Sequence, residues 1–94
     1  MNYARAIRTI RSARGLSQTE FSQIVDIDQS SVSRIESGER KPSVKNLEVI
    51  SEKLSVPFHL IALLASEERD LKGISEQEAQ KLSAGLLKVL VSNP

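Results

Sequence analysis

Two helical segments in the first half of the chain are joined so closely that few folds can accommodate them. The first begins at Ser17-Gln18-Thr19-Glu20, which has the spacing of a capping box, and the second begins at Asp28, a good N-cap. At most three residues, 25–27, lie between them. Because helices joined by so short a connection must cross steeply, the sequence predicts a helix-turn-helix over residues 17–37.

Apolar residues recur at helical spacing, and no segment alternates apolar and polar residues as a half-buried strand does. Gly15 and Gly38 stand where left-handed helix caps are expected. Ser43 is a further N-cap, and Pro57 suits a first helical turn. We therefore expect an all-α fold with helices over about 3–14, 17–25, 28–37, 43–54 and 57–65. The residues expected to face its core are Ile7, Ile10, Phe21, Ile24, Val25, Val32, Ile35, Val44, Leu47, Ile50 and Leu54.

Composition excludes several classes of function. The 94 residues include no cysteine, so neither a disulfide nor a thiolate metal site is possible. His59 is the only histidine and has no catalytic or metal-binding partners in the sequence pattern, so we expect no enzyme, metal or cofactor. No stretch resembles a signal peptide, and the longest apolar run, 60–65, is too short to cross a bilayer. We expect a cytoplasmic protein without a membrane partner.

Positive charge is concentrated in the first half of the chain. Residues 1–45 contain eight Lys/Arg and five Asp/Glu, whereas residues 46–94 contain five and seven. Arg5, Arg8, Arg11 and Arg14 follow one another in the first predicted helix without any acid. This face either meets a polyanion or is merely solvated, and the sequence leaves both interpretations open.

The segment 28–37 has an unusual outer face. With Val32 and Ile35 turned inward, small hydroxyl residues, an amide and an arginine turn outward. Small side chains allow a helix to approach base edges closely, Gln suits adenine, and Arg suits guanine. The alternative is a serine-rich face that is simply solvated. The predicted base-reading residues are Gln29, Ser30, Ser33 and Arg34, and the predicted phosphate contacts on either side are Ser17, Gln18, Ser37, Arg40 and Lys41.

Two charged residues are expected on inward-facing positions. Arg11 is four residues after Ile7, and Glu36 is four residues after Val32. A charge that faces the core is costly unless it is paired. We therefore expect Arg11 and Glu36 to form a partly buried ion pair that orients the reading helix, the alternative being two side chains that reach separately to water.

The run from Ile7 to Leu64 contains a set of residues in a specific order and spacing: Ile10-Arg11, Gly15-Leu16-Ser17-Gln18, Phe21, Ser31-Val32-Ser33-Arg34-Ile35-Glu36-Ser37-Gly38, Lys41-Pro42-Ser43, Leu47 and Ile50. With these residues the run resembles the Cro/C1-type (xenobiotic-response-element type) helix-turn-helix family, which includes the lambdoid phage repressors. The resemblance implies a five-helix, lambda-repressor-like domain that binds double-stranded DNA as a symmetric dimer. It also implies a phosphate contact for Gln18, base-reading positions for the four residues named above, and the internal ion pair. Asp26 stands where the family usually has glycine, and aspartate tolerates a left-handed backbone less freely.

The remainder of the chain, 66–94, is predicted to be a charged linker followed by one more helix. Ser75-Glu76-Gln77-Glu78 is a second capping box, and Gly85 interrupts the apolar stripe that follows it. The stripe packs either on its own chain or on a second copy, and we favour dimerisation. The residues expected at the dimer contact are Leu82, Leu86, Val89 and Leu90, with Ala79 on the same face.

The function predicted from the sequence is a transcriptional repressor that binds an inverted-repeat operator as a homodimer, with residues 1–65 as its DNA-binding domain. The alternative is an antitoxin or another interaction module. In that case the C-terminal helix would cover a partner protein, and DNA binding would be autoregulatory.

Overall fold

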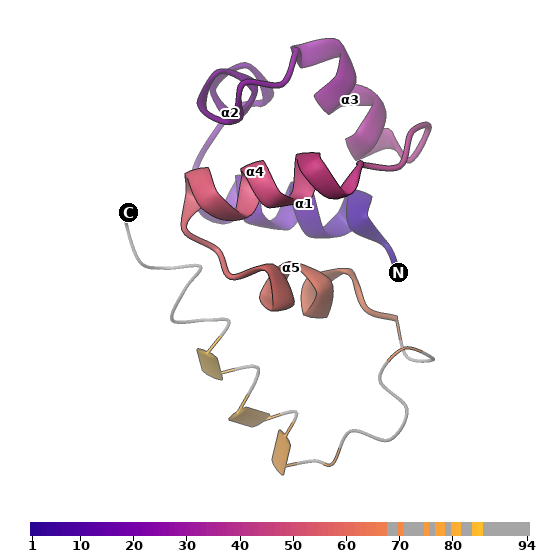
Figure 1. Ribbon diagram of the computed structural model, residues 1–94, viewed down its shortest axis with the longest axis vertical. Coiled ribbons are helices and arrows are strands. Elements are labelled where there is room, and N and C mark those ends of the chain that lie inside the picture. Colours follow the sequence, from indigo (N-terminus) through magenta and orange to yellow (C-terminus); the bar gives the residue numbers. More distant parts are fainter. Residues whose placement is uncertain (68–69, 71–74, 76, 79, 82–83, 86–94) are drawn as a thin grey trace.

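The computed structural model describes residues 1–67, 70, 75, 77–78, 80–81 and 84–85. The elements of this part are all helices, and no strand occurs among the described residues, so the all-α prediction is confirmed. The helices are α1 (Tyr3–Ala13), α2 (Gln18–Val25), α3 (Gln29–Ser37), α4 (Val44–Leu54) and α5 (Phe58–Ala65) (Figure 1).

The helices form three tiers around one core. Figure 1 shows α2 and α3 on one side, α1 and α4 crossing the middle, and α5 on the opposite side. In agreement with this order, α1 packs on both α3 and α5, and α4 packs on both α2 and α5. α3 therefore has its back against α1 and α2 and its outer face at one end of the molecule. The core side chains are Ile7, Ile10, Phe21, Val25, Val32, Ile35, Leu47, Ile50, Leu54, Val56, Leu60 and Ile61.

Side-chain caps begin the three middle helices where the sequence predicts them. The Ser17 hydroxyl accepts from the Glu20 amide, and the Glu20 carboxylate accepts from the Ser17 amide. Ser43 and Asn46 form an equivalent reciprocal pair at the start of α4. Asp28 caps α3 by accepting from the Ser31 amide. These caps are local interactions, so they position the first turn of each helix independently of distant contacts.

The turn between α2 and α3 is built on an aspartate rather than a glycine. Asp26 has φ +54° and ψ +44°, the left-handed conformation, and its amide donates to the Ser22 carbonyl. The turn therefore keeps the conformation that glycine would adopt more freely. Gly38 has φ +84° and ends α3 in the same way, which lets the following loop turn back sharply.

Two predicted core residues are exposed. Ile24 is 41% exposed because the buried side of α2 consists of Phe21, Ser22 and Val25. The small Ser22 side chain therefore faces the core where the sequence predicted Ile24. Val44 is 65% exposed because it is the first residue of α4, where Ser43 and Lys45 also lie at the surface. Helical spacing alone predicts which residues form an apolar stripe, but it does not predict how far the neighbouring helices cover that stripe.

The C-terminal part of the chain is described only in fragments. Residues 77–78, 80–81 and 84–85 have helical backbone, and the Ser75 hydroxyl accepts from the Glu78 amide at 3.1 Å, as a cap there would. No helix among the described residues has the length and apolarity to cross a membrane. The predicted dimer residues Leu82, Leu86, Val89 and Leu90, and Ala79 beside them, lie outside the described residues.

Candidate nucleic-acid interface

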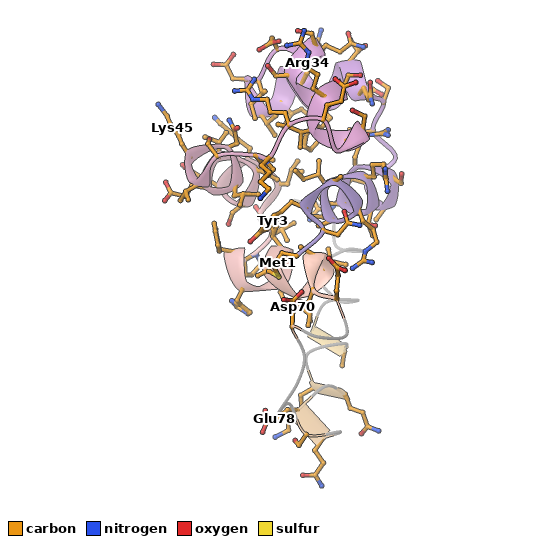
Figure 2. The ribbon with its side chains drawn as sticks, turned by 90° about the vertical axis from the view of Figure 1, so that its right-hand side faces the viewer. Met1, Tyr3, Arg34, Lys45, Asp70 and Glu78 are labelled. Atoms are coloured by element: carbon orange, nitrogen blue, oxygen red, sulfur yellow. The ribbon has the colours of Figure 1, made fainter. Side chains whose placement is uncertain are left out.

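The outer face of α3 is polar and open. Gln29, Ser30, Ser33 and Arg34 are all exposed, while the opposite side of the helix is buried. Figure 2 shows Arg34 at the end of the molecule farthest from the C-terminal fragments. The Ser33 and Arg34 side chains form no hydrogen bond or ion pair with the described residues. Their donors are therefore available to another molecule, within the part of the chain that the structure describes.

The buried side of α3 is anchored by one carboxylate. Glu36 is only 3% exposed, and its two oxygens accept from Nε and Nη2 of Arg11 at 2.8 and 2.9 Å. The predicted contact between these residues is thus present, as a bidentate pair, the stronger arrangement for arginine. The hydrogen bond with Glu36 raises the pKa of Arg11 above its ordinary value.

Gln18 joins the same carboxylate from α2. Its Nε2 donates to Glu36 Oε1 at 3.2 Å, and Arg11 Nη1 donates to the Leu16 carbonyl at 2.9 Å. One buried carboxylate therefore ties α1, the start of α2 and α3 together. The sequence analysis predicted a phosphate contact for Gln18, but it did not reveal this inward bond, which engages one N–H of the amide.

The arginines of α1 bind carbonyl groups of the protein. Arg8 Nη1 donates to the Glu36 carbonyl in the last turn of α3 at 2.8 Å. Arg5 Nη2 donates to the Leu64 and Ser66 carbonyls at the end of α5, at 3.3 and 2.8 Å. Positive charge at the C-terminal end of a helix is stabilising. Arg5, Arg8 and Arg11 recur every three residues on one side of α1, and that spacing is the signal that could have indicated this role.

The start of α3 carries its own hydrogen-bond network. The Asp28 carboxylate accepts from the Ser30 and Ser31 hydroxyls at 2.6 and 2.8 Å and from the Ser31 amide at 3.0 Å. These hydrogen bonds, the one from Ser30 first, lower the pKa of Asp28 to about 2. Because the Ser30 hydrogen is engaged, that side chain offers only its oxygen lone pairs to a base edge.

The predicted phosphate contacts around α3 lie on two surfaces. At the start of α2, Ser17 is exposed, but the adjacent Glu20 carboxylate places a negative charge there; its hydrogen bond from the Ser17 amide lowers the pKa of Glu20. After α3, Ser37 is exposed and its hydroxyl donates to the Arg34 carbonyl at 3.0 Å. The positive charge available to a phosphate therefore lies mainly in the loop after α3.

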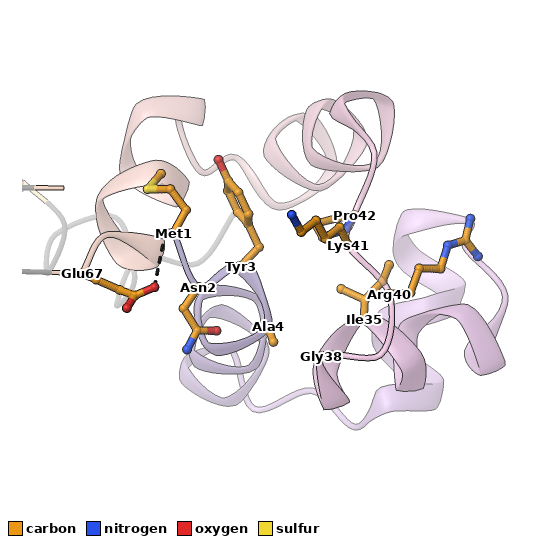
Figure 3. Close-up of a pocket in the computed structure, with 10 residues that line it drawn as sticks. All are labelled: Met1, Asn2, Tyr3, Ala4, Ile35, Gly38, Arg40, Lys41, Pro42 and Glu67. Atoms are coloured by element: carbon orange, nitrogen blue, oxygen red, sulfur yellow. Dashed lines mark hydrogen bonds and ion pairs between the residues drawn. The ribbon is translucent and has the colours of Figure 1, made fainter. Parts of the chain in front are cut away.

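Arg40 and Lys41 point in different directions from that loop. Arg40 Nη1 donates to the Ser31 hydroxyl at 3.1 Å, so its guanidinium lies along α3. Figure 3 shows Lys41 extending the other way, toward Tyr3, across a hollow of about 400 Å³ between the loop and the start of α1. The two side chains therefore extend away from each other on either side of the loop. Lys45, which the sequence analysis did not include among the candidate phosphate contacts, extends outward from the first turn of α4 (Figure 2).

The comparisons with known proteins agree with this geometry. The family model described as helix-turn-helix matches residues 7–61, more than half of the chain. The chain belongs to the Cro/C1-type helix-turn-helix family, and it is a DNA-binding transcription regulator. Comparison with curated proteins and with solved structures found no significant match.

Proposed function

We propose that this protein is a repressor that binds an inverted-repeat operator as a homodimer, with α3 of each copy in the major groove. The observation that carries the proposal is the contrast between the two sides of α3. Its inner side is held by the buried Glu36, whereas Ser33 and Arg34 on its outer side have no hydrogen-bond partner among the described residues. A helix fixed from behind with free donors in front suits the reading of base edges.

Each exposed polar residue of α3 has a role in this proposal. Arg34 donates to guanine, Gln29 reads a purine, and Ser33 makes a short contact that adapts to several bases. Ser30 accepts from a base amino group, because its own hydrogen is bound to Asp28.

Phosphate contacts fix the register of α3 on the duplex. Arg40, Lys41 and Ser37 hold one strand beyond the end of α3, and we add Lys45 to this group. Ser17 and the second N–H of Gln18 hold the other side, at the start of α2. Because Gln18 also binds Glu36, a phosphate there is linked to the carboxylate that anchors α3.

Dimerisation is proposed because one short helix offers few base contacts, and a two-fold axis doubles them. The apolar stripe at Leu82, Leu86, Val89 and Leu90 gives the candidate contact from the sequence. Sedimentation equilibrium of the full chain tests this. We expect a dimer that Leu82→Glu with Leu86→Glu converts to a monomer, and a wild-type monomer at micromolar concentration would contradict it.

Selection of bound sequences from a random DNA pool tests the whole proposal. We expect an inverted repeat whose half-sites are centred about one helical turn, roughly 34–36 Å, apart. Placing the selected site across a promoter should lower reporter expression when the protein is present. Recovery of sequences no different from the input pool would contradict sequence-specific binding, and recovery of a single half-site would contradict the symmetric dimer.

A further inference from the structure

A side chain of α2 touches one of the base-reading residues of α3. The Thr19 hydroxyl donates to Oε1 of Gln29 at 3.1 Å, and both side chains are exposed. Thr19 lies in the first turn of α2, and Gln29 is the first residue of α3. Each of these helix starts is fixed by its own cap, Ser17 or Asp28, so the two side chains meet from rigid positions.

The contact decides which end of the Gln29 amide is turned outward. A glutamine amide has an acceptor oxygen and a nitrogen with two N–H donors. Thr19 holds the oxygen against α2, and the two N–H groups of Nε2 form no hydrogen bond with the described residues. The usual contact of glutamine with adenine needs both ends at once, because adenine offers an acceptor at N7 and a donor at N6.

We propose that Thr19 is a positioning residue that presents Gln29 to the major groove as a donor, so that Gln29 favours guanine over adenine. This inference rests on the proposed function, because it assumes that α3 reads bases. Guanine offers two acceptors, O6 and N7, to an outward-facing Nε2 and has no major-groove donor that needs the glutamine oxygen. Removing the Thr19 hydroxyl frees the amide to rotate and to pair with adenine through both ends.

The test is sequence selection with the full-length chain, three single variants at these positions and one double variant. Gln29→Ala identifies the base position that Gln29 reads, as the position whose preference disappears. Thr19→Val removes the hydroxyl at nearly constant shape, and Thr19→Ser keeps it. At the identified position we expect wild type and Thr19→Ser to select guanine. We expect the guanine preference to fall roughly tenfold in Thr19→Val, with adenine gaining. In Gln29→Ala, adding Thr19→Val should change nothing further.

A matched control is the other threonine of the chain. Thr9 lies on α1, and its hydroxyl donates to the Arg5 carbonyl at 2.7 Å. Thr9→Val should leave base preference unaltered, and urea unfolding checks that every variant is folded. Selection of adenine by wild type at the Gln29 position, or an unchanged guanine preference in Thr19→Val, would overturn the role of Thr19 while leaving DNA reading by α3 intact. Selection of no preferred sequence by wild type would overturn the proposed function itself.

Discussion

The molecule has two basic regions, and they differ in what their donors bind. In α1, Arg5, Arg8 and Arg11 donate to carbonyls and to a carboxylate of the protein. In α3 and the following loop, Arg34 and Lys41 form no such bond with the described residues.

The difference shows that the number of positive charges does not locate a DNA surface. An arginine whose N–H groups already bind helix carbonyls gains little from a phosphate, because it must give up one partner for the other. We therefore assign stability to the arginines of α1 and DNA binding to the cations around α3. The following substitutions test this division, from the largest expected effect to the smallest.

Replacing Glu36 removes the ion pair on the buried side of α3 and leaves the residues on its exposed side in place. Glu36→Gln removes the charge that holds Arg11, and the loss of one partner from a buried ion pair costs about 3–5 kcal/mol. Because the Arg11 side chain is 20% exposed, we expect the lower end, about 3 kcal/mol, in urea unfolding. Glu39→Gln in the exposed loop is the control, with a change within about 0.5 kcal/mol. A loss below about 1 kcal/mol for Glu36→Gln would mean that this pair does not anchor α3.

Replacing Arg34 affects only the exposed side. Arg34→Ala should cost about 1–3 kcal/mol in binding to the selected operator and relax the preference at one base position. Its urea midpoint should equal that of the wild type, because the side chain has no partner among the described residues. Titration of labelled operator variants measures the effect, and an unaltered base preference would show that Arg34 does not read a base.

Two substitutions, one in each basic region, should have opposite effects on stability and on the salt dependence of DNA binding. Arg8→Met should lower the free energy of unfolding by about 1 kcal/mol, since it removes a bond to the Glu36 carbonyl, and leave the salt dependence of DNA binding unchanged. Lys41→Met should leave stability unchanged and lower the slope of log K against log salt by about one. A reduced salt slope in Arg8→Met would place α1 on the DNA after all.

The smallest effect concerns Asp28, the N-cap of α3. Its pKa is about 2 in the folded chain, below its ordinary value of 3.8, so its hydrogen bonds stabilise the fold above pH 4. That contribution is lost as the pH falls from about 4 to about 2. Asp28→Asn keeps an N-cap acceptor but cannot titrate. Thermal unfolding between pH 5 and 2 should therefore show a shallower loss of Tm in Asp28→Asn than in wild type, and equal losses would contradict this.

The sequence predicted much of the fold because helix starts depend on residues three or four apart. The Ser17 and Asp28 caps lie where the sequence analysis placed them, and the outward side of α3 follows from the same periodicity. The errors occur where a helix meets or passes its neighbours: Ile24 and Val44 fit a helical stripe, but no other helix of the described part of the chain covers them. Periodicity within one helix contains no information about the length of the helix packed against it.

The sequence by itself determined the class of fold, the helix that faces outward, and the charge pair between α1 and α3. Only the tertiary structure decided which partners the polar side chains bind. Arg5 reaches carbonyls about sixty residues away, Gln18 turns inward to Glu36, and Thr19 donates to Gln29. The physical reason is the flexibility of these side chains. Their position on a helix fixes the first carbon atoms, whereas the partner is fixed by elements that only the packed fold brings within hydrogen-bond distance.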